Sequence, residues 1–216
     1  NIKAVYVDEQ KSLVYIGTHA GGLTVLHRNS GQMESFNQLN SQLVNENVYA
    51  ILPDKEGSIL LGTLSALVSF NPEKRSFTTI DKEKDGTPFT SQRITILFRD
   101  SRKRLWVGGE EGISVFQQEG IEIEKVPILP EASVTKTFTN CIYEAANGII
   151  WVGTREGFYC FNEKEKKIKR YTTANGLPNN VVYGILEDTF GRLWVSTNRG
   201  ISCFNPETEK FRNFTE

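Results

Sequence analysis

The sequence predicts an all-β protein built from five copies of one four-stranded antiparallel unit. A short β-rich tetrapeptide recurs five times along the chain at nearly constant spacing. Glycine-containing turns flank most of these copies, and no apolar i, i+3, i+4 pattern persists for even about 10 residues, so no long helix is expected. An aromatic content of 11% together with 18 glycines fits many short strands joined by turns.

The repeated tetrapeptide determines the architecture. Its copies are Tyr15-Ile16-Gly17-Thr18, Leu60-Leu61-Gly62-Thr63, Trp106-Val107-Gly108-Gly109, Trp151-Val152-Gly153-Thr154 and Trp194-Val195-Ser196-Thr197. Their third positions are 45, 46, 45 and 43 residues apart. The predicted repeats therefore cover approximately residues 1–44, 45–90, 91–137, 138–178 and 179–216.

Each copy is predicted to contain four strands. An apolar first strand leads into a polar turn, the tetrapeptide forms the second strand, a third strand follows another turn, and the fourth alternates polar and apolar residues. A four-stranded antiparallel unit of about 40–50 residues repeated in tandem is typical of a β-propeller blade. The sequence thus predicts one β-propeller region over residues 1–216. It leaves open whether five blades close into a ring or form an arc of a larger propeller.

Composition excludes several functional classes. The 216 residues carry 25 Lys+Arg and 26 Asp+Glu, a net charge of −1, and a nucleic-acid surface would require a basic excess. No apolar run reaches the roughly 18 residues needed to span a bilayer. Three cysteines cannot all pair, which argues against a disulfide scaffold. The chain starts at Asn1 without an apolar leader, so we expect a processed chain or a piece of a longer one.

Motifs for catalysis and for metal or cofactor binding are absent from the sequence. It contains no Gly-x-Ser-x-Gly elbow, P-loop, dinucleotide fingerprint or His-Glu-x-x-His helix. His19 and His27 are predicted at opposite ends of one hairpin, which separates them too far for a shared metal. Cys160 and Cys203 occupy a position that holds valine in other copies, which indicates packing. We therefore expect no catalytic residue, metal or cofactor in this region.

An acid recurs near the end of each first strand, at Asp8, Asp54, Asp100, Glu144 and Asp188. One interpretation is a ring of catalytic or calcium-binding carboxylates. The favoured interpretation is structural, because an Asp at a turn can accept hydrogen bonds from backbone N–H groups two residues further on. Catalytic carboxylates would be expected as departures from the repeat.

The loops between strands two and three, and between one blade and the next, are where the copies differ most. Propellers commonly bind ligands on the face that these loops form, because rigid sheets hold loops that are able to vary. Arg, Asn and Glu side chains there suit the hydroxyls, carboxylates or sulfates of a carbohydrate. The alternative is that they are ordinary polar loop residues. The candidate ligand-binding residues are His19, Asn47, Arg93, Glu110, Glu111, Asn140, Arg155, Glu156, Asn180, Asn198 and Arg199. The inter-blade loops also contain Asn45, Gln92 and Asn179.

The segment from Asn180 to Ile201 and the preceding Asn175-Gly176-Leu177-Pro178 resemble the two-component-regulator propeller repeat and its inter-blade turn. The resemblance covers all five copies and is strongest in the last two. It is weaker in the first two copies, where Tyr15 and Leu60 replace the tryptophan.

In that family such blades form the periplasmic sensor of hybrid two-component histidine kinases, and the ligands are often oligosaccharides. The resemblance implies a longer parent with further blades, a β-sandwich domain, a transmembrane helix and cytoplasmic signalling modules. The implied partners are an oligosaccharide or other small ligand and the remaining blades and domains of that parent. A homodimer is left open. The alternatives are a carbohydrate-active propeller enzyme, either a lyase or a glycosidase, and a protein-interaction propeller.

Overall fold

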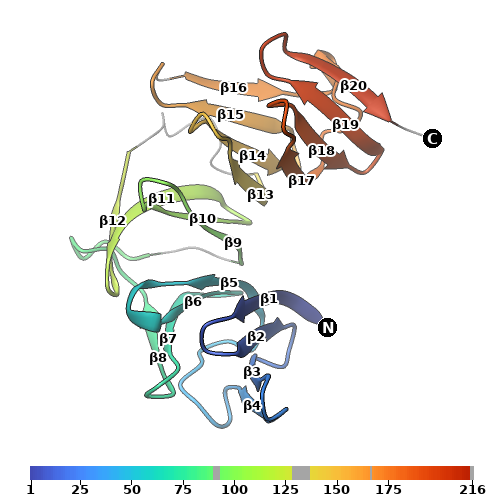
Figure 1. Ribbon diagram of the computed structural model, residues 1–216. Helices are drawn as coiled ribbons and strands as arrows, with labels where there is room; N and C mark the ends of the chain where they lie inside the picture. The colour runs from blue at the N-terminus through green and yellow to red at the C-terminus, as the bar shows by residue number, and fades with distance from the viewer. Residues whose placement is uncertain (90–92, 128–136, 166, 215–216) are drawn as a thin grey trace. The chain divides into compact units, whose positions relative to one another are not determined.

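Five antiparallel sheets, each of four strands paired in sequence order, form the chain (Figure 1). The computed structural model describes residues 1–89, 93–127, 137–165 and 167–214. Each sheet matches one predicted repeat, and we call the sheets blades 1 to 5. The predicted all-β fold of four-stranded antiparallel blades is confirmed.

The strands run blade by blade as follows. Blade 1 contains β1 (Ile2–Asp8), β2 (Leu13–Thr18), β3 (Leu23–His27) and β4 (Met33–Phe36). Blade 2 contains β5 (Val48–Pro53), β6 (Ile59–Thr63), β7 (Leu67–Asn71) and β8 (Ser76–Ile80). Blade 3 contains β9 (Ile94–Arg99), β10 (Leu105–Gly109), β11 (Gly112–Glu119) and β12 (Glu122–Lys125). Blade 4 contains β13 (Thr139–Glu144), β14 (Ile150–Thr154), β15 (Phe158–Asn162) and β16 (Lys167–Tyr171). Blade 5 contains β17 (Val182–Glu187), β18 (Leu193–Thr197), β19 (Gly200–Asn205) and β20 (Lys210–Phe214).

Helical structure in the described ranges is limited to two 3₁₀ turns, η1 (Lys55–Gly57) and η2 (Thr173–Asn175). In the part of the chain that the structure describes, no helix has the length and hydrophobicity that a membrane crossing requires.

The chain divides into two compact units. The first comprises Asn1–Arg99, Arg104–Glu110 and Ser114–Val126, and so holds blades 1 and 2 and most of blade 3. The second comprises Asp100–Lys103, Glu111–Ile113 and Pro127–Glu216, and holds blades 4 and 5. Each unit is described separately below.

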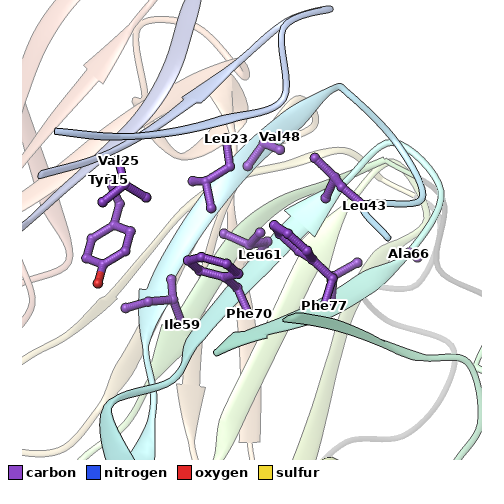
Figure 2. Close-up of a cluster of buried hydrophobic side chains, with 11 residues drawn as sticks. Tyr15, Leu23, Val25, Leu43, Val48, Ile59, Leu61, Ala66, Phe70 and Phe77 are labelled. Atoms are coloured by element: carbon purple, nitrogen blue, oxygen red, sulfur yellow. The ribbon is translucent and has the colours of Figure 1, made fainter. Parts of the chain in front are cut away.

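The hydrophobic cores lie between neighbouring blades. In the first unit, Tyr15 and Leu23 of blade 1 are buried in one cluster with Val48, Leu61 and Phe70 of blade 2 (Figure 2). In the second unit, the ring of Phe204 in blade 5 packs on three rings of blade 4, those of Trp151, Phe158 and Tyr171, with centroids 4.8–5.6 Å apart. Burial of apolar surface between blades is therefore the main stabilisation within each unit.

The third position of the tetrapeptide is glycine because the first strand of the next blade approaches it closely. A Cβ added at Gly17 would lie 2.8 Å from Val48 Cγ1, and one added at Gly62 would lie 2.6 Å from Ile94 Cγ2. In the second unit a Cβ at Gly153 would lie 2.5 Å from Val182 Cγ1. Blade 5 carries Ser196 at this position.

The fourth position of the tetrapeptide is threonine because its hydroxyl closes the turn to the third strand. The hydroxyl donates to a backbone carbonyl three or four residues ahead in the four blades where threonine is present, at distances of 2.8–3.1 Å. The donors are Thr18, Thr63, Thr154 and Thr197. Blade 3 has Gly109 in this place. These bonds fix the backbone of the turns that carry the candidate residues.

A β-bulge interrupts the pairing of the first and second strands at the same place in every blade. The unpaired residues are Lys3, Tyr49, Thr95, Asn140 and Tyr183. A bulge redirects side chains and increases local twist, and bulges are enriched near binding sites. The side chains at these five positions differ from blade to blade, whereas the preceding residue is buried in blades 2 to 5.

The recurrent acids do not all occupy one position. Strand pairing places Glu144 opposite Ile150 and Glu187 opposite Leu193, so Glu144 corresponds to Glu187 and Ala145 takes the place of Asp188. The predicted turn role holds for Asp188, whose Oδ1 accepts from the backbone N–H groups of Phe190 and Arg192 at 2.9 and 3.0 Å. It also holds for Asp8, which accepts from Lys11 N at 3.0 Å. Glu144 instead accepts from both the N–H and the hydroxyl of Ser101.

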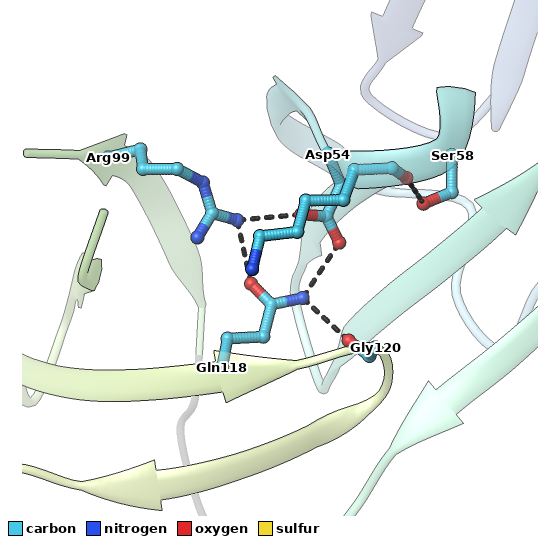
Figure 3. A network of polar contacts seen from close by, with 6 residues as sticks. Asp54, Ser58, Arg99, Gln118 and Gly120 are labelled. Carbon is cyan, nitrogen blue, oxygen red and sulfur yellow. Dashed lines mark hydrogen bonds and ion pairs between the residues drawn. The ribbon is translucent and has the colours of Figure 1, made fainter.

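Asp54 differs most from the predicted turn role. Its carboxylate accepts from Arg99 Nη2 at 2.8 Å and from Gln118 Nε2 at 2.7 Å, and both donors belong to blade 3 (Figure 3). Gln118 also accepts from Arg99 at 2.7 Å and donates to Gly120 O at 2.8 Å. The Asp54 side chain is only 6% exposed, so this network is a largely buried bond between blades 2 and 3.

Candidate functional site

Three blades of the first unit contribute side chains to one cluster on the loop side. His19 follows β2, Tyr49 is the bulge residue of β5, and Arg93 immediately precedes β9. The Tyr49 hydroxyl lies 3.4 Å from His19 Nδ1, and the Arg93 guanidinium lies 5.5 Å from the centre of the Tyr49 ring. That separation is within the range of a cation–π contact.

The Asn47 side chain binds the backbone of the turn that carries His19. Its Oδ1 accepts from Ala20 N at 3.1 Å, which ties the turn that carries His19 to the entry of blade 2. Its own N–H and Nδ2 groups donate to Asn45 Oδ1, an arrangement in which Asn45 fixes the turn. Asn179 binds Val181 N in the corresponding turn before blade 5. Asn47 and the turn around it therefore position the site.

Arg93 adopts a left-handed backbone conformation with φ of +49°, which is uncommon for a residue other than glycine. Its N–H donates to Leu64 O at 2.8 Å, and Leu64 N donates to Asn47 O at 3.2 Å. The inter-blade loops are thus linked by backbone hydrogen bonds, and Arg93 is held over Tyr49 by a strained backbone. Strain of this kind is found at binding sites more often than elsewhere.

Chemically, the cluster offers an aromatic face, a guanidinium and an imidazole within one small region. An aromatic ring can pack on the C–H face of a sugar, and Arg, Asn and His can donate hydrogen bonds to hydroxyl, carboxylate or sulfate oxygens. Among the described residues no group of three His, Cys, Asp or Glu side chains is arranged to hold a metal ion.

The second unit uses its candidate residues differently. The Arg155 guanidinium lies 4.1 Å from the centre of the Phe138 ring, and Arg155 N donates to Phe138 O at 3.0 Å. Asn140 Nδ2 donates to Val182 O at 2.8 Å, which ties blade 4 to blade 5. The Glu156 carbonyl accepts from the Arg170 guanidinium. These contacts stabilise the loops themselves.

The remaining candidates lie in other turns of the chain. Glu110 and Glu111 are exposed in the turn between β10 and β11, and Asn198 and Arg199 are exposed in the turn between β18 and β19. Asn180 Oδ1 accepts from Thr173 N at 2.9 Å. Gln92 lies outside the described residues. Ligand binding by each of these residues stays a prediction.

Sequence reasoning missed Tyr49 and Phe138. Both lie where a blade begins, and both carry the aromatic ring on which a candidate arginine lies. The only signal in the sequence is that Tyr49 and Tyr183 both stand eleven residues before the start of the tetrapeptide in their blades. That spacing does not reveal the bulge, because a bulge is visible only in the pairing register.

A concave region lies elsewhere in the first unit, with a volume of about 540 Å³. It is lined by Glu83, Lys84, Asp85, Thr87, Glu124 and Lys125. Carboxylates and ammonium groups both line it, and Glu83 accepts from Lys125 N at 3.2 Å. The balanced charge favours no class of ligand.

Comparison with known proteins finds a similar repeat in two segments of the chain. Residues 133–156 and 176–199 match the family model described as two component regulator propeller. A histidine kinase from Formosa agariphila is 29% identical over 161 residues, which cover 71% of this chain and 12% of the kinase. The chain therefore spans about an eighth of the length of that relative.

Solved structures share the fold. The extracellular domain of BT4673 from B. thetaiotaomicron, assigned as a one component system, superposes with a TM-score of 0.76 at 20% identity, covering 94% of this chain and 27% of that one. The extracellular domain of BT3049 from the same organism, assigned as a hybrid two component system, gives a TM-score of 0.74 at 18% identity, covering 100% and 28%. PorZ, a surface component of the type-IX secretion system of Porphyromonas gingivalis, gives 0.70 at 14% identity, covering 99% and 33%.

Proposed function

We propose that this chain, whose blades carry the two-component-regulator propeller repeat, is part of the periplasmic sensor region of a hybrid two-component histidine kinase and binds an oligosaccharide. The relative from F. agariphila supports the kinase, and the extracellular domains from B. thetaiotaomicron support the location. On this proposal the region itself performs no chemistry.

The observation that carries the ligand proposal is the convergence of His19, Tyr49 and Arg93 from three successive blades. The combination departs from the repeat, because the bulge residues of blades 1, 3 and 4 are Lys3, Thr95 and Asn140. In the blade before Tyr183, Arg155 takes the place of His19. A feature shared by all blades would be expected to serve the fold, whereas a combination found once is available for recognition. The Tyr49 ring would pack on a sugar face, and Arg93 and His19 would donate to its oxygens.

Signalling would then follow from a shift between conformations. A ligand changes an equilibrium only by the difference between its affinities for the two states. The cluster joins three blades, so a ligand bound there would favour one arrangement of those blades over another. The change would reach the kinase through the parts of the parent that this chain does not include.

The test is isothermal titration calorimetry of the chain against a panel of neutral, uronate-containing and sulfated oligosaccharides. For the oligosaccharide that binds, Tyr49→Ala and Arg93→Gln should each weaken binding by about 1–3 kcal/mol, roughly fivefold to 150-fold, because each removes a partner of the bound sugar. Tyr49→Phe should retain most of the affinity if ring packing dominates.

Tyr183→Ala is the matched control, since Tyr183 occupies the same bulge position in blade 5 and is 53% exposed. Its affinity should equal that of the unchanged chain. Equal losses from Tyr49→Ala and Tyr183→Ala, or binding that survives both Tyr49→Ala and Arg93→Gln, would show that the ligand binds elsewhere. Absence of binding across the panel, measured in the parent sensor region as well, would remove the oligosaccharide proposal.

A further inference from the structure

The fourth strand of each blade is an edge strand, because it pairs with a neighbouring strand of its sheet on one side only. Alternate residues of such a strand direct their N–H and C=O groups away from the sheet, where another strand can bind them. Proteins usually prevent this pairing by placing charged residues on the edge or by covering it. In the described ranges, the edge strands of blades 1, 3, 4 and 5 show one or both of these devices. The edge strand of blade 2, β8, shows neither.

Two edge strands bind loops of their own chain. Asn40 Nδ2 in the loop after β4 donates to Ser35 O of that strand at 2.9 Å. The loop after β8 binds β12, where Lys84 N donates to Ile123 O at 2.8 Å. In both strands a hydrogen-bonding group of the backbone is thus already occupied.

The edge strands of blades 1, 3, 4 and 5 also carry charges. These are Glu34 in β4, Glu122, Glu124 and Lys125 in β12, Lys167, Lys169 and Arg170 in β16, and Lys210 and Arg212 in β20. Glu34 pairs with Arg75 of the next blade, and at the corresponding place in blade 4 Lys169 pairs with Glu209. Centred antiparallel pairing of β16 or β20 with a second copy of itself would place Lys169 or Arg212 opposite its own copy, which is unfavourable.

β8 contains no charged residue. It reads Ser-Phe-Thr-Thr-Ile from Ser76 to Ile80, and its central residue is Thr78. Strand pairing shows that Thr78 stands at a position that is charged in three other blades, where the residues are Glu34, Lys169 and Arg212. The repulsion that guards the other edges is therefore missing from β8.

The edge of β8 is open, although both faces of the strand are covered. Phe77 is buried in the cluster that blade 2 shares with blade 1, and Ile80 is buried in the cluster that it shares with blade 3. Thr78 is exposed. In the part of the chain that the structure describes, no loop or side chain hydrogen-bonds to β8 from outside its sheet. A partner for this strand would therefore bind the edge and not a face.

β8 is complementary to a second copy of itself. In an antiparallel pair centred on Thr78, this residue lies opposite its own copy. Phe77 then lies opposite Thr79, and Ser76 lies opposite Ile80. Pairs of threonines and pairs of an aromatic with a β-branched residue are favourable across strands. No charges of the same sign meet along the five residues of the strand.

The charges at the two ends of β8 also match. Arg75 immediately precedes the strand, Asp81 immediately follows it, and both are exposed. In the centred antiparallel pair, Arg75 of each copy lies opposite Asp81 of the other, so a pair of opposite charges closes each end. An in-register parallel pair would instead place like charges opposite each other. The flanking residues therefore favour the antiparallel arrangement.

We propose that β8 is an interaction surface at which two copies of this chain pair edge to edge, antiparallel, with the twofold axis at Thr78. Such an edge buries less than the roughly 1,200 Å² of a stable interface, so we expect a weak dimer with a dissociation constant of about 0.1 mM. An association this weak becomes significant where other parts of a longer protein hold two copies together, because linkage raises the effective concentration.

The test is sedimentation velocity of the 216-residue chain between about 5 μM and about 1 mM, where a monomer should give way to a dimer. Thr78→Lys and Thr78→Glu should each raise the dissociation constant by about tenfold or more, because each places like charges opposite each other on the axis. An equimolar mixture of the two variants should associate again, because lysine then faces glutamate. Thr208→Lys is the matched control, since it adds the same charge at an exposed threonine in a turn of blade 5. It should leave the association unchanged.

A disulfide tests the register directly. Opposed residues of antiparallel strands have Cα atoms about 4.5–5.5 Å apart, which a disulfide can bridge. With oxidised glutathione as the oxidant, Thr78→Cys should form a covalent dimer, whereas Thr208→Cys should not. The native Cys141 and Cys160 are half-buried and Cys203 is buried, and the unchanged chain gives their background.

Three results would overturn the proposal. One is a monomer throughout the concentration range. Another is a dimer that persists in both Thr78→Lys and Thr78→Glu, or a mixture of the two that does not associate. The third is growth beyond the dimer, because a closed twofold pair leaves no β8 edge for a third copy. Thermal unfolding followed by circular dichroism confirms that each variant is folded.

Discussion

Asp54 and Asp188 occupy the same position in blades 2 and 5 and make opposite kinds of contact. Each follows the first strand and precedes the tetrapeptide by six residues. The carboxylate of Asp54 reaches into blade 3 and binds Arg99 and Gln118. The carboxylate of Asp188 stays in its own turn, where Arg192 Nε and Trp194 Nε1 donate to it at 2.8 and 3.0 Å.

The difference shows that one residue type at one position of the repeat serves two purposes. In blade 2 the next blade supplies the donors, and the acid joins two sheets. In blade 5 the acid closes a turn together with the arginine and tryptophan of the same blade. The contribution of this position to stability therefore depends on which donors bind the carboxylate, and the residue type alone does not determine it.

The largest expected effect comes from breaking the contact between blades. Asp54→Ala should cost about 3–5 kcal/mol, because it removes the carboxylate that accepts hydrogen bonds from both Arg99 and Gln118 in a largely buried network. Urea unfolding followed by circular dichroism measures the loss. Asp188→Ala is the matched control and should lower the urea midpoint by less. Equal shifts for the two variants would mean that the buried bond adds nothing beyond a turn.

The second prediction compares the stability effects of substitutions at the third position of the tetrapeptide in blades 4 and 5. Gly153→Ser gives blade 4 the residue that blade 5 has, and its Cβ would meet Val182 Cγ1 at 2.5 Å. The expected cost is about 1–3 kcal/mol from overpacking. Ser196→Gly, the reverse change, should alter the unfolding free energy by less than about 1 kcal/mol in this chain. A similar cost for both would contradict the requirement for close approach.

The third effect concerns pH. Burial acts to raise the pKa of Asp188, but hydrogen bonds from Trp194, Arg192 and Phe190 outweigh it and lower the pKa from 3.8 to about 2. The unfolded chain therefore binds a proton more readily near pH 3, and this contribution to stability is present above about pH 4 and is lost as pH falls through about 2. Melting temperatures between pH 6 and pH 2.5 should fall less steeply for Asp188→Asn than for the unchanged chain. Parallel curves would exclude Asp188 as the group responsible.

The smallest effect is expected at the outer ion pair of the first unit. Arg75 and Glu34 have side chains 65% and 24% exposed, and such pairs contribute about 0–1 kcal/mol. Glu34→Lys should lower the melting temperature slightly, and adding Arg75→Glu should restore it, since the second unit uses the exchanged arrangement at the corresponding place. A double variant no more stable than Glu34→Lys alone would show that the two charges do not interact.

The sequence contained enough information to predict the fold. The tetrapeptide spacing predicted five four-stranded blades, and Thr18, Thr63, Thr154 and Thr197 recur because their hydroxyls close the turns. Asp188 binds its own turn as predicted. These features are local, so the identity and spacing of nearby residues are sufficient to predict them.

Contacts between blades could not be predicted in the same way. Asp54 and Arg99 are 45 residues apart in the sequence, and no motif near either residue predicts the bond between them. The bulge at Tyr49 depends on pairing register, and the correspondence of Glu144 with Glu187 appears only once the strands are paired. The candidate site depends on local sequence and on strand pairing. Local sequence predicted His19 and Arg93, whereas the place of the Tyr49 ring depends on the pairing register.

In blades 1, 2, 4 and 5 the threonine bond that closes the turn between the second and third strands has a consequence for how such proteins diversify. Because hydroxyl and carbonyl fix the backbone from both sides, the residues between them can be exchanged without reshaping the loop. Each of these four blades thus offers a short variable segment on a constant frame. New specificities could arise there by point substitution, and a library randomised at these turns would sample binding without sampling misfolding.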